Sequence, residues 1–242
     1  MKKYPYRVMK FIQDHIELID NYKFDELFNL EDAIILYPVV VQPFYDIDID
    51  PLKYMTIIPD CLFEHCNWMS SITIPTNITR IKSNAFNESS FETIAIENGV
   101  KRIDYLAFAN SALKQIHFPK SVTELGQYVC CYCRELTEVT LPPVEVIPHQ
   151  AFYNCNIQKL KIPSGVRWIH AKAFGANISL QKLVLPDTLE ALNDECFSGC
   201  CDLTEICYQG TIKQWNYIYK GDLVFKHVPA KVVHCLDGDT EL

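Results

Sequence analysis

The stretch IHAKAFGANISLQKLVLPDTL, residues 169–189, carries the apolar pattern that decides the fold. Its Phe174 marks a position that occurs seven times, at intervals of 22 or 23 residues. The residues at this position are Phe63, Phe86, Phe108, Cys130, Phe152, Phe174 and Phe197. A fixed period in this range is the sequence signature of a solenoid, in which each copy forms one turn of a stack. The repeat therefore predicts a solenoid over residues 55–208.

Each copy also contains two apolar residues separated by one other residue, which predicts a short β-strand. Alternate residues of a strand point to opposite sides, so each pair would face the core. A proline often follows, as Pro186 does here, and it would end the strand because it cannot donate a hydrogen bond to a neighbour. Stacked copies would bury the pairs in one shared core. The pairs are Ile72/Ile74, Ile94/Ile96, Ile116/Phe118, Val139/Leu141, Leu160/Ile162 and Leu183/Leu185.

The full pattern, I-x-x-x-A-F-x-x-C-x-x-L-x-x-I-x-I-P-x-x-V, resembles the BspA-like class of leucine-rich repeats. The resemblance covers about residues 55–208 and implies an α/β leucine-rich-repeat solenoid with a parallel β-sheet on its concave side. The chain departs from the pattern in having Cys130 at the phenylalanine position and Glu97 at a proline position. Ser89, Ser111 and Asn177 stand at the cysteine position, and we expect the fold to tolerate all of these changes.

The residues outside the repeat are interpreted as caps, because the ends of an open stack would otherwise expose apolar side chains. In residues 1–54, Val8, Phe11 and Ile12 fall at helical spacing and predict a helical N-terminal cap, with an independent functional domain as the alternative. In residues 209–242, Thr211 and Gln214 match a capping box, and residues 232–234 predict a last strand. We expect a short α/β C-terminal cap there.

Composition and cysteine usage favour a soluble protein of the cytoplasm. The net charge of −8 argues against direct binding to nucleic acid, which depends on Lys and Arg to neutralise phosphates. Polar residues interrupt the N-terminal apolar residues, and no apolar run reaches about 18 residues, so we expect neither a secretory signal nor a membrane span. Eleven cysteines, an odd number, then favour reduced thiols over a disulfide framework.

The sequence offers little support for a catalytic or metal site. Cys131, Cys133, Cys196, Cys200 and Cys201 raise a zinc hypothesis, but the paired knuckles of a zinc site are missing. Four cysteines share one repeat position and are expected to form a buried column: Cys66, Cys133, Cys155 and Cys200. No phosphate-binding loop or catalytic signature occurs, so we predict no enzyme activity and no cofactor.

The outward residues of the predicted strands form the candidate binding surface. Parallel stacking would place Glu138, Lys159, Lys182 and Glu205 in one row, about 4.8 Å apart, with opposite charges paired at both ends. This row is either a solvated, self-neutralising face or a mixed-charge patch that selects a complementary partner. The candidate partner-binding residues are Ser71, Thr73, Thr93, Ala95, Gln115, His117, Glu138, Thr140, Lys159, Lys161, Lys182, Val184 and Glu205.

A regular scaffold without catalytic signatures favours a protein–protein interaction module that acts inside the cell. Its partner would be another protein, held on the concave sheet, without nucleic acid or membrane. The alternative is a phage-encoded inhibitor whose acidic surface blocks a host defence protein such as a nuclease, because similar repeats occur in phages. A surface adhesin is a third reading, opposed by the expected lack of an export signal.

Overall fold

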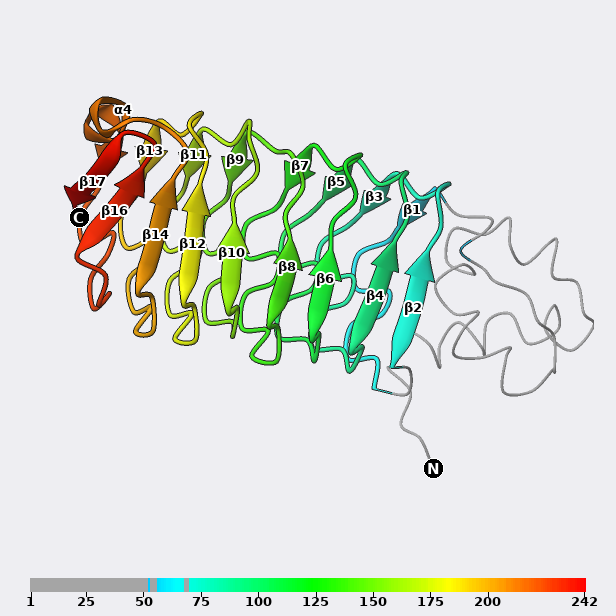
Figure 1. Cartoon of the computed structure of the whole chain (residues 1–242). Helices are drawn as coiled ribbons and strands as arrows, with labels where there is room; N and C mark the ends of the chain where they lie inside the picture. Colours follow the sequence, from blue (N-terminus) through cyan, green and yellow to red (C-terminus); the bar gives the residue numbers. More distant parts are fainter. Residues whose placement is uncertain (1–51, 53–55, 68–69) are drawn as a thin grey trace, which may run out of the picture. The chain divides into compact units, whose positions relative to one another are not determined.

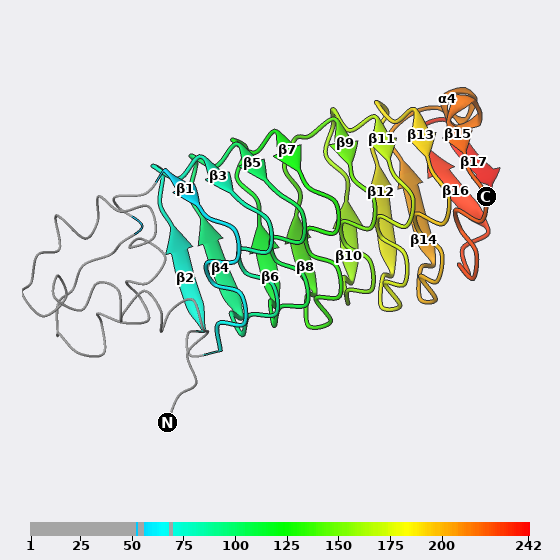
Figure 2. The ribbon, with the colours of Figure 1, turned by 180° about the vertical axis from the view of Figure 1, so that it is seen from behind.

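The computed structural model describes residues 52, 56–67 and 70–242, which include the repeat region except residues 55 and 68–69 (Figure 1). Contacts divide the chain into two compact units, Met1–Thr56 and Ile57–Leu242. The predicted helical cap of residues 1–54 lies outside the described residues apart from Leu52, and it stays a prediction. The second unit is a solenoid whose successive turns lie side by side, with strands on two opposite sides (Figures 1 and 2).

One side of the solenoid carries the longer strands, and it pairs as predicted. Ile72, Ile94, Ile116 and Val139 are in register across a four-stranded parallel sheet, as are Leu160, Leu183 and Ile206 in the next sheet. The first sheet consists of β2 (Ser71–Ile74), β4 (Thr93–Ile96), β6 (Gln115–His117) and β8 (Glu138–Thr140). The second consists of β10 (Lys159–Lys161), β12 (Lys182–Leu185), β14 (Glu205–Tyr208), β16 (Val232–Cys235) and the antiparallel β17 (Gly238–Glu241).

The opposite side carries two-residue strands, which the sequence pattern did not reveal as strands. In six of these strands one apolar residue, such as Ile81 or Ile103, is buried while its neighbour is more exposed; Leu125 of the strand Glu124–Leu125 is half-buried, and both residues of Tyr219–Lys220 are exposed. Four pair as β1 (Ile57–Ile58), β3 (Arg80–Ile81), β5 (Arg102–Ile103) and β7 (Glu124–Leu125). Four more pair as β9 (Val146–Ile147), β11 (Trp168–Ile169), β13 (Ala191–Leu192) and β15 (Tyr219–Lys220).

The two sets of strands are joined by turns that bond to one another along the stack. Fifteen non-glycine residues of the described part have positive φ, and they recur in the same turn, as at Tyr128 (60°) and Tyr132 (61°). This conformation is unfavourable for residues with a side chain. Backbone hydrogen bonds between turns hold it: Phe86 donates to the carbonyl of Ala107, and Phe108 to that of Val129, at 2.7 and 2.8 Å.

The phenylalanine position forms a column of stacked, buried rings. Phe152 and Phe174 lie 5.4 Å apart between ring centroids, and Phe174 and Phe197 lie 5.5 Å apart. Each fully buried ring stabilises the fold by about 1.5–3 kcal/mol. Cys130 interrupts this column, and Phe118, a strand residue, packs edge-on against Phe152 at 6.2 Å. The larger strand side chain thus occupies the space that the small thiol leaves.

Strand pairing stops between β8 and β10, and likewise between β7 and β9. The chain between these strands contains Pro142 and Pro143, which cannot donate to a ladder, and its turn is one residue shorter than in the neighbouring copies. The turns themselves stay bonded across the break, since Gln158 donates its backbone N–H to the carbonyl of Thr137 at 3.2 Å. The solenoid is therefore continuous while its two faces are each divided into two sheets.

The stack extends one turn beyond residue 208, where the sequence pattern ends. β15 pairs with β13, β16 pairs with β14, and Phe225 stacks on Phe197 at 5.8 Å. Between β14 and β15 lies helix α4 (Ile212–Tyr217), whose predicted capping box is present at Thr211 and Gln214. Trp215 of this helix is buried against Tyr208.

α4 is the single α-helix among residues 52, 56–67 and 70–242. The expected α/β class is therefore wrong for this part of the chain, which is a β-solenoid of about eight turns. The reason is the length of the repeat: after its strands and their connections, each copy has room for a tight turn around its phenylalanine but not for a helix. None of the described segments has the length and apolarity that a helical membrane crossing needs.

Candidate functional site

All thirteen candidate partner-binding residues lie on one side of the solenoid, on strands β2 to β14 of the two longer-stranded sheets. We call this surface the long-strand face. Each of the thirteen side chains is exposed or half-exposed. One row along the face is formed by Ser71, Thr93, Gln115 and Glu138, continued beyond the break by Lys159, Lys182 and Glu205. A second row is formed by Thr73, Ala95, His117 and Thr140, continued by Lys161 and Val184.

Half of the predicted charge row is formed as expected. Lys182 and Glu205 are opposite each other in register, and the Lys182 ammonium forms an ion pair with the Glu205 carboxylate. This hydrogen bond lowers the pKa of Glu205 and raises that of Lys182. Both side chains are more than two-fifths exposed, so the pair contributes little to stability.

The predicted pair at the other end of the row, Glu138 with Lys159, is not formed. These two residues lie on β8 and β10, the strands that do not pair, so they are not in register. Among the described side chains, neither Lys159 nor Lys161 has an acidic partner within 4.0 Å. The break in the sheet therefore leaves the Lys159 ammonium unpaired, next to that of Lys161, whose register partner is the uncharged Val184.

A hollow of about 440 Å³ lies at this break. It is open to solvent and collects side chains from β8, β10 and β12, so three lysines and one glutamate surround a small apolar floor. The lining residues are Thr137, Glu138, Val139, Gln158, Lys159, Leu160, Lys161, Lys182 and Val184. We call this the lysine hollow.

A second hollow, of about 420 Å³, lies over β2, β4 and β6 of the same face. Small side chains such as Ser71, Thr73 and Ala95 line it, together with Ile72 and Ile94. His117 closes one side and shares a hydrogen bond of 2.9 Å between its Nδ1 and the Thr140 hydroxyl. The long-strand face thus offers an uncharged half and a charged half.

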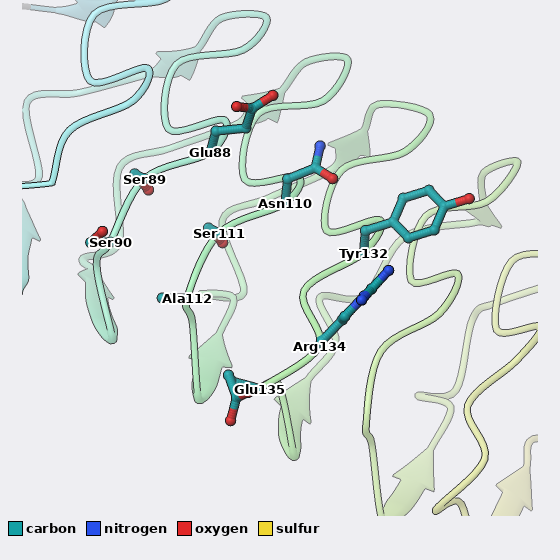
Figure 3. Close-up of a pocket in the computed structure, with 9 residues that line it drawn as sticks. All are labelled: Glu88, Ser89, Ser90, Asn110, Ser111, Ala112, Tyr132, Arg134 and Glu135. Carbon is teal, nitrogen blue, oxygen red and sulfur yellow. The ribbon is translucent and has the colours of Figure 1, made fainter.

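The turns present aromatic residues that sequence reasoning missed. Tyr105 and Tyr132 are 46% and 41% exposed, and each packs edge-on against another tyrosine, Tyr128 and Tyr153 respectively. A hollow of about 410 Å³ lies beside Tyr132, where Arg134 projects from the following strand connection (Figure 3). The signal in the sequence that indicates this surface is the presence of tyrosines at the turn positions of neighbouring copies. We call this surface the turn edge.

On the short-strand side, arginine side chains form ion pairs with acidic side chains. Asp104 is 7% exposed and accepts hydrogen bonds from both Arg80 and Arg102, and Arg102 also bonds Glu124. Further along, Arg167 bridges two glutamates, Glu145 and Glu190, and lies 4.5 Å from the centre of the Trp168 ring. Trp168 itself is half-buried on β11, as a strand residue and not a free surface aromatic.

The cysteine position forms the predicted buried column. Its residues donate hydrogen bonds to carbonyls at the phenylalanine position: Cys133 to Phe108 at 3.0 Å, and Asn177 to both Phe152 and Phe174 at 2.8 Å. Burial raises the pKa of the Cys200 thiol to about 12, so it is protonated at neutral pH. Within the residues that the structure describes, no three His, Cys, Asp or Glu side chains gather in a way that could hold a metal ion.

Comparison with known proteins places the repeat in a family. The profile described as "BspA type Leucine rich repeat region (6 copies)" matches residues 44–146 and 145–221. No curated protein sequence gives a significant match. Among solved structures, a leucine-rich repeat protein from Eubacterium ventriosum ATCC 27560 is similar, with a TM-score of 0.63 and 21% identity. The alignment covers 76% of this chain and 50% of that protein, so the chain spans half of its length.

Two further structures share the fold. The T. pallidum leucine-rich repeat protein has a TM-score of 0.60 and 22% identity, over 66% of this chain and 76% of its own. A leucine-rich repeat protein from Bacteroides ovatus ATCC 8483 has a TM-score of 0.51 and 23% identity, over 76% and 59% of the two chains. At these identities the likeness establishes a common architecture.

Proposed function

The chain belongs to the BspA-type leucine-rich repeat proteins, and we propose that it is an interaction module that holds a protein partner on its long-strand face. The observation that carries this proposal is the arrangement of thirteen exposed or half-exposed residues in two rows over parallel strands. A stack of hydrogen-bonded turns keeps such a surface rigid, which lowers the entropy lost when a partner binds.

We propose binding rather than catalysis. Catalytic groups are usually found where several titratable side chains with shifted pKa values converge in one pocket. Here most of the shifted pKa values belong to thiols, such as Cys155 and Cys196, whose pKa is raised by burial, and to ion-paired residues such as Lys182. Of the described residues with a shifted pKa, Lys182 alone lines a hollow of the long-strand face, and there it is engaged by its ion pair with Glu205.

The setting we propose is the cytoplasm. All eleven cysteines lie in the described part of the chain and are free thiols, and seven of them are buried. Free thiols in this number suit a reducing compartment. Fractionation of the native cells, followed by detection with an antibody against the solenoid, tests this: the protein should appear in the soluble cytoplasmic fraction, and recovery at the cell surface would favour an adhesin.

A second candidate function is inhibition of a nucleic-acid-binding defence protein, such as a host nuclease. The observation in its favour is the net charge of −8, which suits a basic nucleic-acid channel. It predicts that a captured partner is a basic, nucleic-acid-binding protein whose cleavage activity falls when this chain is added. If the captured partner has no such activity, the inhibitor hypothesis is wrong, while the proposal of an interaction module still holds.

The proposed docking face is tested by affinity purification from native lysate with three matched variants of the full chain. A95R/T140R places two bulky cations on the long-strand face, Y128A/Y132A removes two rings from the turn edge, and T123R changes the short-strand side. We expect only A95R/T140R to lose the partner that the wild type enriches. Loss with Y128A/Y132A alone would move the docking surface to the turn edge and contradict the proposal.

A further inference from the structure

We propose that the lysine hollow binds an acidic segment of the partner in an extended conformation, with Asp or Glu at alternate positions. This inference rests on the proposed function, because it names the chemistry that one half of the long-strand face would recognise. The starting observation is that the local charge at the lysine hollow differs in sign from the net charge of the chain. The chain has a net charge of −8, yet Lys159 and Lys161 lie exposed, without an acidic partner among the described side chains.

Lys159 is unpaired because of the break in the sheet, whereas Lys161 is unpaired because its register partner on β12 is the uncharged Val184. On one side, Lys182 is engaged by Glu205, so its ion pair is directed away from β10. On the other side, the missing ladder between β8 and β10 keeps Glu138 from pairing with Lys159. Charge complementarity across an interface favours a partner group that supplies the missing negative charges.

The spacing of Lys159 and Lys161 indicates that the negatively charged group of the partner is an extended peptide segment. Lys159 and Lys161 are two residues apart on one strand, so they project from the same face, roughly 7 Å apart along the strand. Alternate side chains of any extended segment have the same spacing. A peptide that lies along β10 can therefore place one carboxylate opposite each lysine.

The neighbouring charges favour a segment that lies along β10 over one that lies across the strands. Across the strands, the row reads Glu138, Lys159, Lys182, Glu205, so a run of acids laid across the face would meet a glutamate at each end. Along β10 the acids meet lysines only. Val184 lies opposite Lys161 on β12 and gives the segment an apolar contact beside its second acid. A compact anion such as phosphate could reach one lysine but would not depend on alternate spacing.

The test uses labelled eight-residue peptides and the full chain. One peptide has glutamate at alternate positions, a second has the same composition with its glutamates adjacent, and a third has lysine in place of glutamate. Binding is measured by fluorescence anisotropy at low salt, and zero-length carbodiimide coupling followed by mass spectrometry locates the carboxylates. Two charge-matched variants are compared: K159E/K161E, and K101E/K120E, in which two exposed turn lysines away from β10 are changed.

We expect the alternating acidic peptide to bind the wild type and K101E/K120E within twofold of each other, and K159E/K161E at least tenfold more weakly. Its coupling sites should be Lys159 and Lys161. Three results would each overturn the proposal and indicate a general attraction of anions. They are equal binding of the two acidic peptides, coupling spread evenly over the exposed lysines, and an equal loss of peptide affinity in both variants. Competition by millimolar inorganic phosphate with no preference for spacing would assign the hollow to a single anion instead.

This result is separable from the proposed function. If A95R/T140R loses the native partner while the alternating peptide does not bind, the long-strand face stands as the docking surface and the acidic-segment inference falls. If the peptide binds and couples as expected while A95R/T140R retains the partner, the hollow is a peptide site and the face-wide docking proposal falls.

Discussion

The rings of Phe118 and Phe152 pack edge-on, 6.2 Å apart between centroids, although Phe118 belongs to a strand and Phe152 to a turn. Phe118 also contacts Phe108, at 6.4 Å. It bridges the two halves of the phenylalanine column, in which Cys130 leaves a gap. Where one copy has a smaller turn residue, a larger strand residue of another copy keeps the core filled.

Phe118→Ala should lower the free energy of unfolding by about 3–5 kcal/mol, because it would open a cavity beside Cys130. Cys130→Phe alone should also destabilise, by about 1–3 kcal/mol, since Phe118 already occupies the space. The double variant should be more stable than the sum of the two losses predicts. Urea unfolding of the four proteins measures this coupling, and strict additivity would show that the two side chains do not share one space.

Ser89 and Ser111 stand at the same repeat position but differ in their hydrogen bonds. The buried Ser111 hydroxyl donates to the carbonyl of Phe108 at 2.7 Å, whereas the buried Ser89 hydroxyl has no partner in the described structure. Ser89→Ala should therefore raise the free energy of unfolding by roughly 1 kcal/mol, because it removes an unsatisfied group. Ser111→Ala should lower it by roughly 1–3 kcal/mol. Thermal unfolding of both variants checks this, and a loss of stability in Ser89→Ala would contradict it.

Asp104 is the acidic centre of the short-strand side, between Arg80 and Arg102. Its side chain is only 8% exposed, so Asp104→Ala would leave two arginines facing each other and should destabilise the fold by roughly 1–3 kcal/mol. The matched change Glu124→Ala removes an exposed partner of Arg102 and should cost about 0–1 kcal/mol. Chemical denaturation distinguishes the two, and equal effects would show that burial of Asp104 does not matter.

The ion pair of Lys182 and Glu205 predicts a small acid dependence. Because Lys182 lowers the pKa of Glu205 in the folded protein, the stabilisation is present above the pKa of the unfolded chain and is lost as the pH falls through the lower folded pKa. The difference in melting temperature between the wild type and Glu205→Gln should therefore be larger at pH 7 than at pH 3. A difference that is unchanged or grows at acidic pH would mean that the pair does not persist in solution.

The sequence was sufficient for the features that repeat. The period of the phenylalanine position, the paired apolar residues and the cysteine column predicted the long strands, their register and the buried column. Thr211 and Gln214 likewise predicted the helix start, because a capping box is a local signal. These features follow from residue spacing alone.

The features that depend on three-dimensional pairing were missed. The strand break arises at Pro142 and Pro143, and a constant period gives no sign that Glu138 and Lys159 fall out of register. Two-residue strands such as Arg102–Ile103 are too short to show alternation. The strand at residues 232–234 was predicted, but not that it belongs to a further turn of the stack, because helix α4 lengthens that copy: Phe225 follows Phe197 by 28 residues. The exposure of Tyr132 on the turn edge depends on the side-chain direction that its positive φ imposes.

The central claim is that a protein partner docks on the long-strand face, and photo-crosslinking from single positions tests it most directly. A photoreactive amino acid is placed at Ala95 on the long-strand face, at Tyr132 on the turn edge, or at Thr123 on the short-strand side, and each protein is irradiated in native lysate. We predict that the partner is coupled from Ala95 and not from Thr123 or Tyr132. Coupling from Thr123 or Tyr132 with none from Ala95 would contradict the account.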